Sequence, residues 1–153
     1  MKFNKISHEI LQKLKSIVGE EFVFIDEESK INYGHDETED LSFPPEVVIK
    51  PGNANEISEI LKICNKEFIP VTPIGGRTGL SGGSLSVFGG IALSMERFNK
   101  IISIDEKNLQ AIVERGVITQ VFQEAVIEKG LFYPPDPSSR GSCFLGGNIA
   151  ENA

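Results

Sequence analysis

The sequence contains few cysteines and histidines, no cluster of basic residues and no long apolar run. Its two cysteines, Cys64 and Cys143, match no disulfide framework and no CxxC-type metal or redox motif. The 15 Lys and Arg residues against 22 Asp and Glu give a net charge of −7, which excludes a binder of the nucleic-acid backbone. No stretch approaches the ~18 apolar residues of a membrane span, and the N-terminus lacks the hydrophobic segment of a signal peptide. We therefore expect a cytoplasmic protein that binds no nucleic acid.

The first 43 residues combine a helical pattern with an acidic, polar stretch. Residues 4–18 place apolar side chains at helical spacing, and Gly19 is a typical stop signal. From Asp26 to Leu41 the composition is polar and acidic, which predicts a surface loop with little regular structure. We divide the chain into this N-terminal helix and loop over residues 1–43 and a partial domain over residues 44–153.

The partial domain begins with a strand, a helix and a second strand. Val47-Val48-Ile49 is a β-branched run bounded by prolines, and residues 68–71 form a second short strand. Asn53 or Asn55 can cap the helix between them, whose apolar face contains Ile57, Ile60, Leu61 and Cys64. Cys64 is then a small core residue. The order predicts a βαβ unit with parallel strands.

Beyond residue 90 the pattern becomes antiparallel. Residues 91–95, 100–104 and 109–114 form short strands separated by polar turns, which suggests a meander. Thr119 then caps a helix that ends at Gly130, with its inward positions at Val121, Phe122, Ala125 and Val126. A βαβ subdomain followed by an antiparallel strand and helix subdomain belongs to the α+β class.

The first candidate binding element is a glycine-dense stretch, PIGGRTGLSGG, over residues 73–83. It directly follows the second predicted strand. Because it is rich in glycine, its backbone can approach a ligand closely. Successive free amides, with the Thr78 and Ser81 hydroxyls, suit an anion such as phosphate. The spacing gives neither GxGxxG nor GxxxxGK[ST], which excludes the Rossmann fingerprint and the P-loop. A glycine-rich surface loop without a ligand is the alternative.

The second candidate binding element combines PPDPSS, over residues 134–139, with GGNIAENA, over residues 146–153. The prolines fix a rigid loop, and the glycine pair restores free amides and close approach. A ligand held between such a loop and a glycine turn would meet a pre-organised site, which lowers the entropic cost of binding.

Taken in order, these motifs and the elements between them resemble the FAD-binding (PCMH-type) domain of the vanillyl-alcohol oxidase and p-cresol methylhydroxylase superfamily. The closest resemblance is to the branch of D-lactate dehydrogenases and the FAD subunit of glycolate oxidase, over about residues 30–153. The resemblance implies that the FAD pyrophosphate is cradled by Ile74, Gly75, Gly76, Arg77, Thr78, Gly79 and Leu80. It also implies that the adenine–ribityl and isoalloxazine side is lined by Pro135, Asp136, Ser139, Gly146, Gly147 and Asn148.

The chemistry that the resemblance implies is oxidation of a D-2-hydroxy acid to the 2-oxo acid by hydride transfer to the flavin. A quinone, a cytochrome or a partner subunit then reoxidises the flavin. In the family, the substrate-binding arginine, the acid/base histidines and any metal that they hold lie in later segments. The resemblance therefore assigns no catalytic residue and no metal site within these 153 residues.

Several positions depart from the branch or allow a second interpretation. Ile74 stands where arginine is more common and Arg77 where glycine is, so Arg77 can replace a lost charge–phosphate contact. The loop holds no histidine, which implies non-covalent FAD. Cys143 lies near where some relatives form a cysteinyl–flavin bond, but no activating surroundings are visible. His35 invites a catalytic role, yet its acidic context favours a solvated loop histidine.

The sequence stops at Ala153, inside the second glycine motif, so we expect a fragment that is incomplete at its C-terminus. The full-length enzyme would take a small-molecule 2-hydroxy acid and could use a separately encoded C-terminal half or an electron-transfer partner. The 153 residues alone are expected to be inactive. The alternatives are a truncated or split-gene flavin-binding module, a non-functional product, and the same fold acting on alditols or aryl alcohols. Peripheral attachment to the inner face of a membrane is the alternative location.

Overall fold

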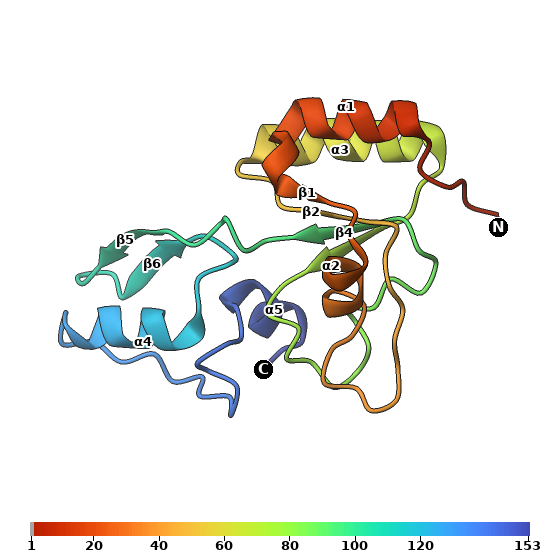
Figure 1. The fold of residues 1–153 in the computed structure, drawn as a ribbon. Coiled ribbons are helices and arrows are strands. Elements are labelled where there is room, and N and C mark those ends of the chain that lie inside the picture. The colour runs from red at the N-terminus through yellow and green to blue at the C-terminus, as the bar shows by residue number, and fades with distance from the viewer. Residues whose placement is uncertain (1) are drawn as a thin grey trace.

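A four-stranded mixed sheet forms the centre of the larger lobe (Figure 1). The computed structural model describes residues 2–153. The strand order is β1-β2-β4-β3, with β1 (Val23–Phe24) antiparallel to β2 (Val47–Ile49). β4 (Ile91–Ser94) pairs in parallel with β2 on one side and with β3 (Val71–Ile74) on the other. The predicted parallel relation of the two βαβ strands is confirmed, but β4 lies between them.

Two helices cover one face of this sheet (Figure 1). α1 (His8–Val18) ends at Gly19 as predicted, and α3 (Ala54–Glu67) is capped by Asn53, whose side chain accepts from the Glu56 amide at 3.0 Å. The core between helices and sheet is made of aliphatic side chains and one cysteine, chiefly Leu14, Val18, Ile49, Ile60, Cys64 and Leu93.

The residues predicted for the apolar face of α3 have different outcomes, and Ile60 is fully buried as predicted. Cys64 is a core residue, as predicted, and burial raises the pKa of its thiol to about 11. Leu61 is 44% exposed, so its predicted place in the core is wrong. The predicted strand over residues 68–71 is also shifted, because Phe68 ends α3 in the left-handed conformation at φ 53° and the strand begins only at Val71.

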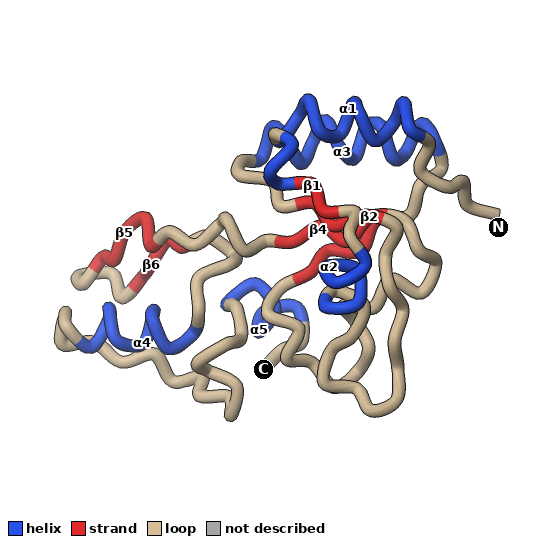
Figure 2. Tube along the Cα trace, viewed as in Figure 1, coloured by secondary structure: helices blue, strands red, loops and turns tan. Residues whose placement is uncertain are grey.

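The acidic stretch after β1 was expected to be irregular, but it contains α2 (Glu27–Asn32), on the other face of the sheet (Figure 2). Asp26 caps this helix by accepting from the Ser29 amide at 2.8 Å, and Lys30 pairs with Glu27 at 2.8 Å. Acidic residues at a helix N-terminus also interact favourably with its dipole. Tyr33 follows directly and packs on this face with Val48, Ile74 and Ala92.

Tyr33 also belongs to a partly buried polar cluster with Lys50 and Glu96. Its hydroxyl donates to Glu96, and the Lys50 ammonium donates to the same carboxylate at 2.7 Å while lying over the ring at 5.3 Å. Burial works to raise the pKa of Glu96, but the hydrogen bonds from Lys50 and Tyr33 outweigh it and hold that pKa below its ordinary value of 4.5.

This cluster makes stability depend on pH. Because the folded pKa of Glu96 lies below its unfolded value, its stabilisation is complete above pH 4.5 and is lost as the pH falls through the folded pKa. Glu96→Gln is expected to flatten that part of the fall in unfolding free energy, measured by urea denaturation at a series of acidic pH values. Glu9→Gln, which removes a fully exposed pair with Lys13, is the control and is expected to change the curve less. Identical acid limbs for wild type and Glu96→Gln would contradict this role.

The smaller lobe contains a hairpin packed on a helix. β5 (Ile101–Asp105) and β6 (Gln110–Val113) pair antiparallel, and α4 (Thr119–Ile127) covers them (Figure 1). The core of this lobe is formed by Val117, Phe122, Val126 and Leu145. The α+β class is confirmed, but the three-stranded meander is wrong, because its first strand is β4 of the parallel sheet.

Two further details of the smaller lobe differ from the predictions. α4 is preceded by Ile118, and Thr119 lies inside it and is fully buried rather than capping. Val121 is 49% exposed, whereas Phe122 and Val126 face inward as predicted. Gly130 closes the turn after the helix at φ 71°.

Short elements complete the chain. A 3-10 turn, η1 (Glu20–Phe22), links α1 to β1, and α5 (Leu145–Ala150) lies between the two lobes (Figure 1). Gly146 and Gly147, predicted as a turn, are therefore helical.

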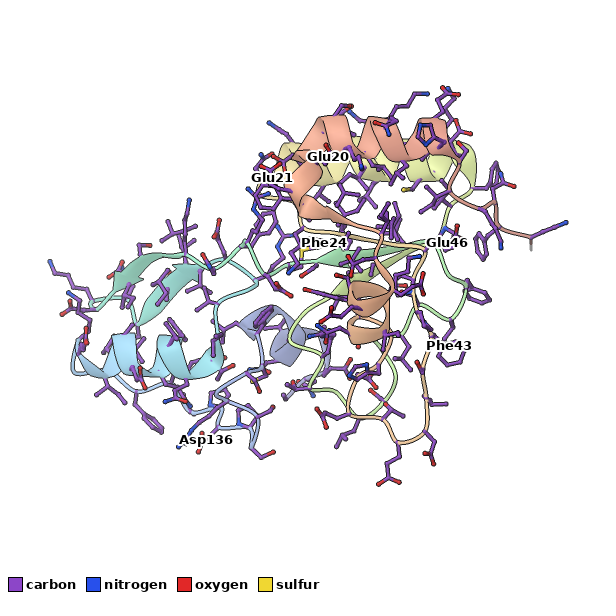
Figure 3. The ribbon with its side chains drawn as sticks, in the orientation of Figure 1. Glu20, Glu21, Phe24, Phe43, Glu46 and Asp136 are labelled. Carbon is purple, nitrogen blue, oxygen red and sulfur yellow. The ribbon has the colours of Figure 1, made fainter. Side chains whose placement is uncertain are left out.

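Glu46, labelled in Figure 3, accepts from the Ile6 amide at 3.0 Å and the Gly90 amide at 3.4 Å, which ties the N-terminal segment to the start of β4. Among residues 2–153, no helix combines the length and apolar character needed to cross a membrane.

Candidate functional site

The glycine loop, residues 75–84, leaves the end of β3 with its backbone donors free. Within the part of the chain that the structure describes, no amide from Gly75 to Ser84 donates a hydrogen bond. Arg77 is in the left-handed region at φ 58°, whereas its neighbours Gly76 and Thr78 are not. Alternation of this kind turns successive amides toward one point and forms an anion-binding concavity. The loop therefore has the geometry that an anion site requires.

The glycine loop packs against the segment before α5. A Cβ on Gly76 would lie 2.5 Å from the Ser142 carbonyl oxygen and 3.1 Å from Cys143 Cα, so only glycine allows this approach. Ser81 Oγ donates to Glu151 Oε2 at 3.2 Å, which links the far side of the loop to the end of α5. Two motifs that are distant in the sequence are thus joined in space.

Between them lies a cavity of about 280 Å³. Its walls are formed by the glycine loop, by residues 137–144, and by residues 147–153 of α5 and the segment after it. The residues of the predicted site that line it are Gly75, Gly76, Arg77, Thr78, Gly79, Ser139, Gly147 and Asn148. The structure therefore brings the two predicted glycine elements to one cavity.

The other predicted site residues lie elsewhere. Ile74 is fully buried in β3, and the Leu80 side chain is 77% exposed. Gly146 packs against Arg115, to whose carbonyl its amide donates at 2.9 Å. Pro135 and Asp136 belong to the loop under α4, away from the cavity walls.

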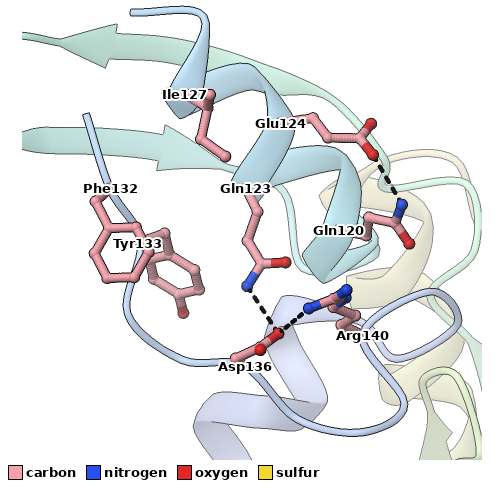
Figure 4. A pocket seen from close by; sticks show the side chains of 8 residues that line it. All are labelled: Gln120, Gln123, Glu124, Ile127, Phe132, Tyr133, Asp136 and Arg140. Carbon is pink, nitrogen blue, oxygen red and sulfur yellow. Dashed lines mark hydrogen bonds and ion pairs between the residues drawn. The ribbon is translucent and has the colours of Figure 1, made fainter. Parts of the chain in front are cut away.

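Asp136 lines a separate pocket of about 270 Å³ beside α4 (Figure 4). Its carboxylate pairs with Arg140 at 2.8 Å and lies 3.4 Å from the amide nitrogen of Gln123. The hydrogen bonds from Arg140 and Gln123 lower the pKa of Asp136. Gln123 also donates to the Pro135 carbonyl at 2.9 Å. These contacts shape the PPDPSS loop, of which Pro137 and Ser139 line the cavity.

Among the other residues that line the cavity, Asp36, Phe144 and Glu151 were not assigned to the site by sequence reasoning. Asp36 is only 8% exposed, and its carboxylate accepts from the Thr38 amide at 2.9 Å and lies 3.4 Å from Ser84 Oγ. Phe144 lines the cavity next to Gly75, and Glu151 lines it from the end of α5. Asp36 lies in an acidic stretch whose composition indicates solvent exposure, so no sequence signal marked it as buried.

Arg77 does not direct its charge into open space. Its guanidinium lies 4.3 Å from the centre of the Tyr33 ring, donates to the Asn32 carbonyl and lies 3.2 Å from Asn32 Oδ1. A non-glycine residue in the left-handed region costs about 1–2 kcal/mol, and a cation–π contact at an exposed site returns about 0.5–1 kcal/mol. The side-chain contacts thus offset much of the backbone strain.

A buried polar network supports the cavity floor. Asn148 is 7% exposed and donates to Thr119 Oγ1 at 2.6 Å. Thr119 Oγ1 in turn lies 3.3 Å from the Cys143 carbonyl and 3.2 Å from its sulfur. This network fixes α5 relative to α4. His35, by contrast, is exposed with Nδ1 2.9 Å from the Ile31 carbonyl, as expected of a loop histidine.

The cavity's chemistry is that of a binding site. Free amides supply positive potential, while Asp36 and Glu151 supply the carboxylates. No histidine or lysine of the described residues lines it. The amides of the glycine loop have no partner in the protein, and Gly76 lets the loop approach Ser142 closely. A loop of this kind fits the pyrophosphate of a dinucleotide such as FAD.

Comparison with known proteins identifies the same cofactor. A family model described as an FAD binding domain matches residues 45–153. The chain is 41% identical to glycolate oxidase subunit GlcD of Bacillus subtilis over 97% of its length, and 36% identical to D-lactate dehydrogenase of Anaerostipes hadrus over 99%. It covers 32% of each of those proteins, so it spans about a third of the curated relatives it matches.

Solved structures agree on the fold. Alkyldihydroxyacetonephosphate synthase superposes on 98% of this chain with a TM-score of 0.85 at 18% identity, and this chain covers 30% of it. 4-Ethylphenol oxidase from Gulosibacter chungangensis superposes on 85% with a TM-score of 0.71 at 29% identity, and this chain covers 27% of it. p-Cresol methylhydroxylase superposes with a TM-score of 0.68 at 22% identity over 85% of this chain and 27% of its own. This chain therefore belongs to the FAD binding domain family of the vanillyl-alcohol oxidase and p-cresol methylhydroxylase type, with FAD as its cofactor.

Proposed function

We propose that this chain is the N-terminal FAD-binding portion of an oxidoreductase that oxidises a D-2-hydroxy acid, of D-lactate or glycolate type, to the 2-oxo acid. The observation that carries the cofactor part is the run of unpartnered amides from Gly75 to Ser84 at the edge of a cavity. The substrate class is supported by the relatives, which are named glycolate oxidase subunit, D-lactate dehydrogenase and D-2-hydroxyglutarate dehydrogenase.

In this proposal the amides of the glycine loop hold the FAD pyrophosphate, with the Thr78 hydroxyl as a further donor. Ser139 and α5, through Gly147 and Asn148, form the opposite wall. Bound FAD supplies a two-electron acceptor for the hydride of the substrate. The residues of this chain bind and orient the cofactor, and the residues that contact the substrate are expected outside it.

Attachment of FAD is proposed to be non-covalent. The cavity wall contains no histidine among the described residues, and the Cys143 side chain is only 3% exposed. Its sulfur lies 3.2 Å from the neutral Thr119 hydroxyl, and reactive cysteines are more exposed than this one.

The test is reduction of the flavin in the whole protein that carries this chain. Under anaerobic conditions, D-lactate, glycolate or D-2-hydroxyglutarate is expected to bleach the flavin absorption band, and L-lactate is the matched control that is expected to leave it. Denaturation should then release the flavin into the supernatant, as expected for non-covalent binding. Reduction by an alditol or aryl alcohol but by none of the hydroxy acids would overturn the proposed substrate class. A purified protein that binds no flavin would overturn the proposal as a whole.

A further inference from the structure

The glycine loop is attached at three points to residues 32–38, which sequence analysis treated as part of a plain acidic loop. The Arg77 guanidinium lies on Tyr33 and Asn32, and Ser84 Oγ lies 3.4 Å from the Asp36 carboxylate. The Glu37 amide donates to the Gly79 carbonyl at 3.1 Å. The loop has no ladder or helical hydrogen bonds of its own, so these contacts and those to residues 142–151 hold its shape.

Arg77 provides the attachment at the residue where the backbone φ becomes positive. Among residues 75–79 it alone has a positive φ, and that reversal is what aims successive amides together. Its side chain is already occupied by an aromatic face and a carbonyl oxygen. Tyr33 is itself fixed, since it is 5% exposed and its hydroxyl donates to Glu96. The guanidinium therefore rests on a rigid surface.

We infer that Arg77 is a positioning residue. Held by Tyr33 and Asn32, it maintains the left-handed turn that presents the loop amides to the FAD pyrophosphate, instead of contacting phosphate with its own charge. This inference rests on the proposed role of the glycine loop. It makes residues 32–33 a support of the glycine loop, although neither lines the cavity.

The first experiment titrates FAD into the flavin-free whole protein at low and high salt. Arg77→Ala keeps a non-glycine residue in the strained turn without the ring contact and without the charged hydrogen bond to the Asn32 carbonyl, and it is expected to raise the FAD Kd about tenfold. Arg77→Gly relieves the strain and is expected to have a smaller effect. Tyr33→Leu loses only the ring contact and is expected to raise the Kd about two- to fivefold, whereas Tyr33→Phe keeps the ring and is expected to stay closer to wild type than Tyr33→Leu. The salt dependence of Kd is expected to be the same in all of them.

The second experiment measures amide hydrogen exchange in the flavin-free protein. Residues 75–84 are expected to exchange faster in Arg77→Ala and Tyr33→Leu than in wild type and Tyr33→Phe. Because Tyr33 is buried, the thermal unfolding of each variant is measured as well. Asn32→Ala, at an exposed position, removes the Oδ1 contact and keeps the carbonyl contact, so it is expected to have the same effects in smaller size with little risk to folding.

Two results would overturn the inference while the proposed function stands. One is unchanged exchange in residues 75–84 with wild-type FAD affinity in Tyr33→Leu. The other is a weaker salt dependence in Arg77→Ala with Arg77→Gly equally impaired, which is the signature of a direct charge contact with phosphate. Absence of FAD binding by the wild-type protein would instead overturn the proposed function.

Discussion

Replacing Gly76 by alanine is expected to cost the whole protein both stability and FAD affinity. The added methyl group would lie 2.5 Å from the Ser142 carbonyl oxygen, and both partners are backbone, so neither can move aside alone. Overpacking of this kind costs about 1–3 kcal/mol of unfolding free energy. If FAD requires the original loop position, the same free energy appears as a rise in Kd of about ten- to a hundredfold. Urea denaturation of the flavin-free protein and titration with FAD measure the two effects separately.

Gly79→Ala is the matched control for Gly76→Ala. A Cβ on Gly79 has no atom within 4 Å, and its φ is not in the left-handed region. Its unfolding free energy is expected to stay within about 0.5 kcal/mol of wild type. Equal stability of the Gly76→Ala and Gly79→Ala proteins would show that the loop does not pack on residues 142–143 in solution.

The two neighbouring glycines of α5 are expected to respond to alanine with opposite signs. A Cβ on Gly146 would lie 2.8 Å from Arg115 Cβ and 2.9 Å from its carbonyl oxygen, whereas one on Gly147 has no atom within 4 Å. Gly146→Ala is therefore expected to destabilise the fold by about 1–3 kcal/mol. Gly147→Ala should stabilise it by up to about 1 kcal/mol, because alanine is the better helix former.

FAD affinity provides the second measurement on this pair. Gly147 lines the cavity, so its new methyl group would take space on the ligand side, and the Kd for FAD is expected to rise although the fold becomes more stable. Thermal unfolding of flavin-free protein and titration with FAD would show this divergence. Loss of stability in Gly147→Ala, or wild-type FAD affinity in it, would contradict the placement of α5.

Elements whose signals are local were predictable, as was the antiparallel pairing of β5 with β6, but the long-range pairing of β4 was not. α3 carries its own cap at Asn53 and its own apolar spacing, so its start and most of its buried face were predicted. β4 was recognised as a strand, but its partners lie 20 and 44 positions away, and the pattern of residues 91–95 does not encode them. α2 was missed because its cap at Asp26 lies in a stretch whose composition indicates a loop.

The candidate site divides in the same way. The glycine motifs are contiguous, and the resemblance assigned the residues from Gly75 to Gly79 that line the cavity. Asp36 could not be assigned, because it becomes buried only when residues 34–44 fold back beside the glycine loop. Asp136 was placed on the flavin side by the motif, yet its carboxylate pairs with Arg140, four residues along the same loop. Whether the gathered residues bind FAD stays a prediction for the titrations above.

The position of β4 between β2 and β3 has a consequence for the order of folding. β2 and β3 share no hydrogen bonds, so the strand–helix–strand unit has no closed sheet when it leaves the ribosome. β2 and β3 are joined in the sheet only through β4, which is synthesised after the glycine loop. Non-local pairing of this kind is slow. The proposed cradle for the cofactor is thus part of the crossover between two parallel strands that cannot pair until β4 has been made. Flavin present during synthesis would meet this crossover before the sheet has closed, and a slow refolding step that is faster in excess FAD is the expected result.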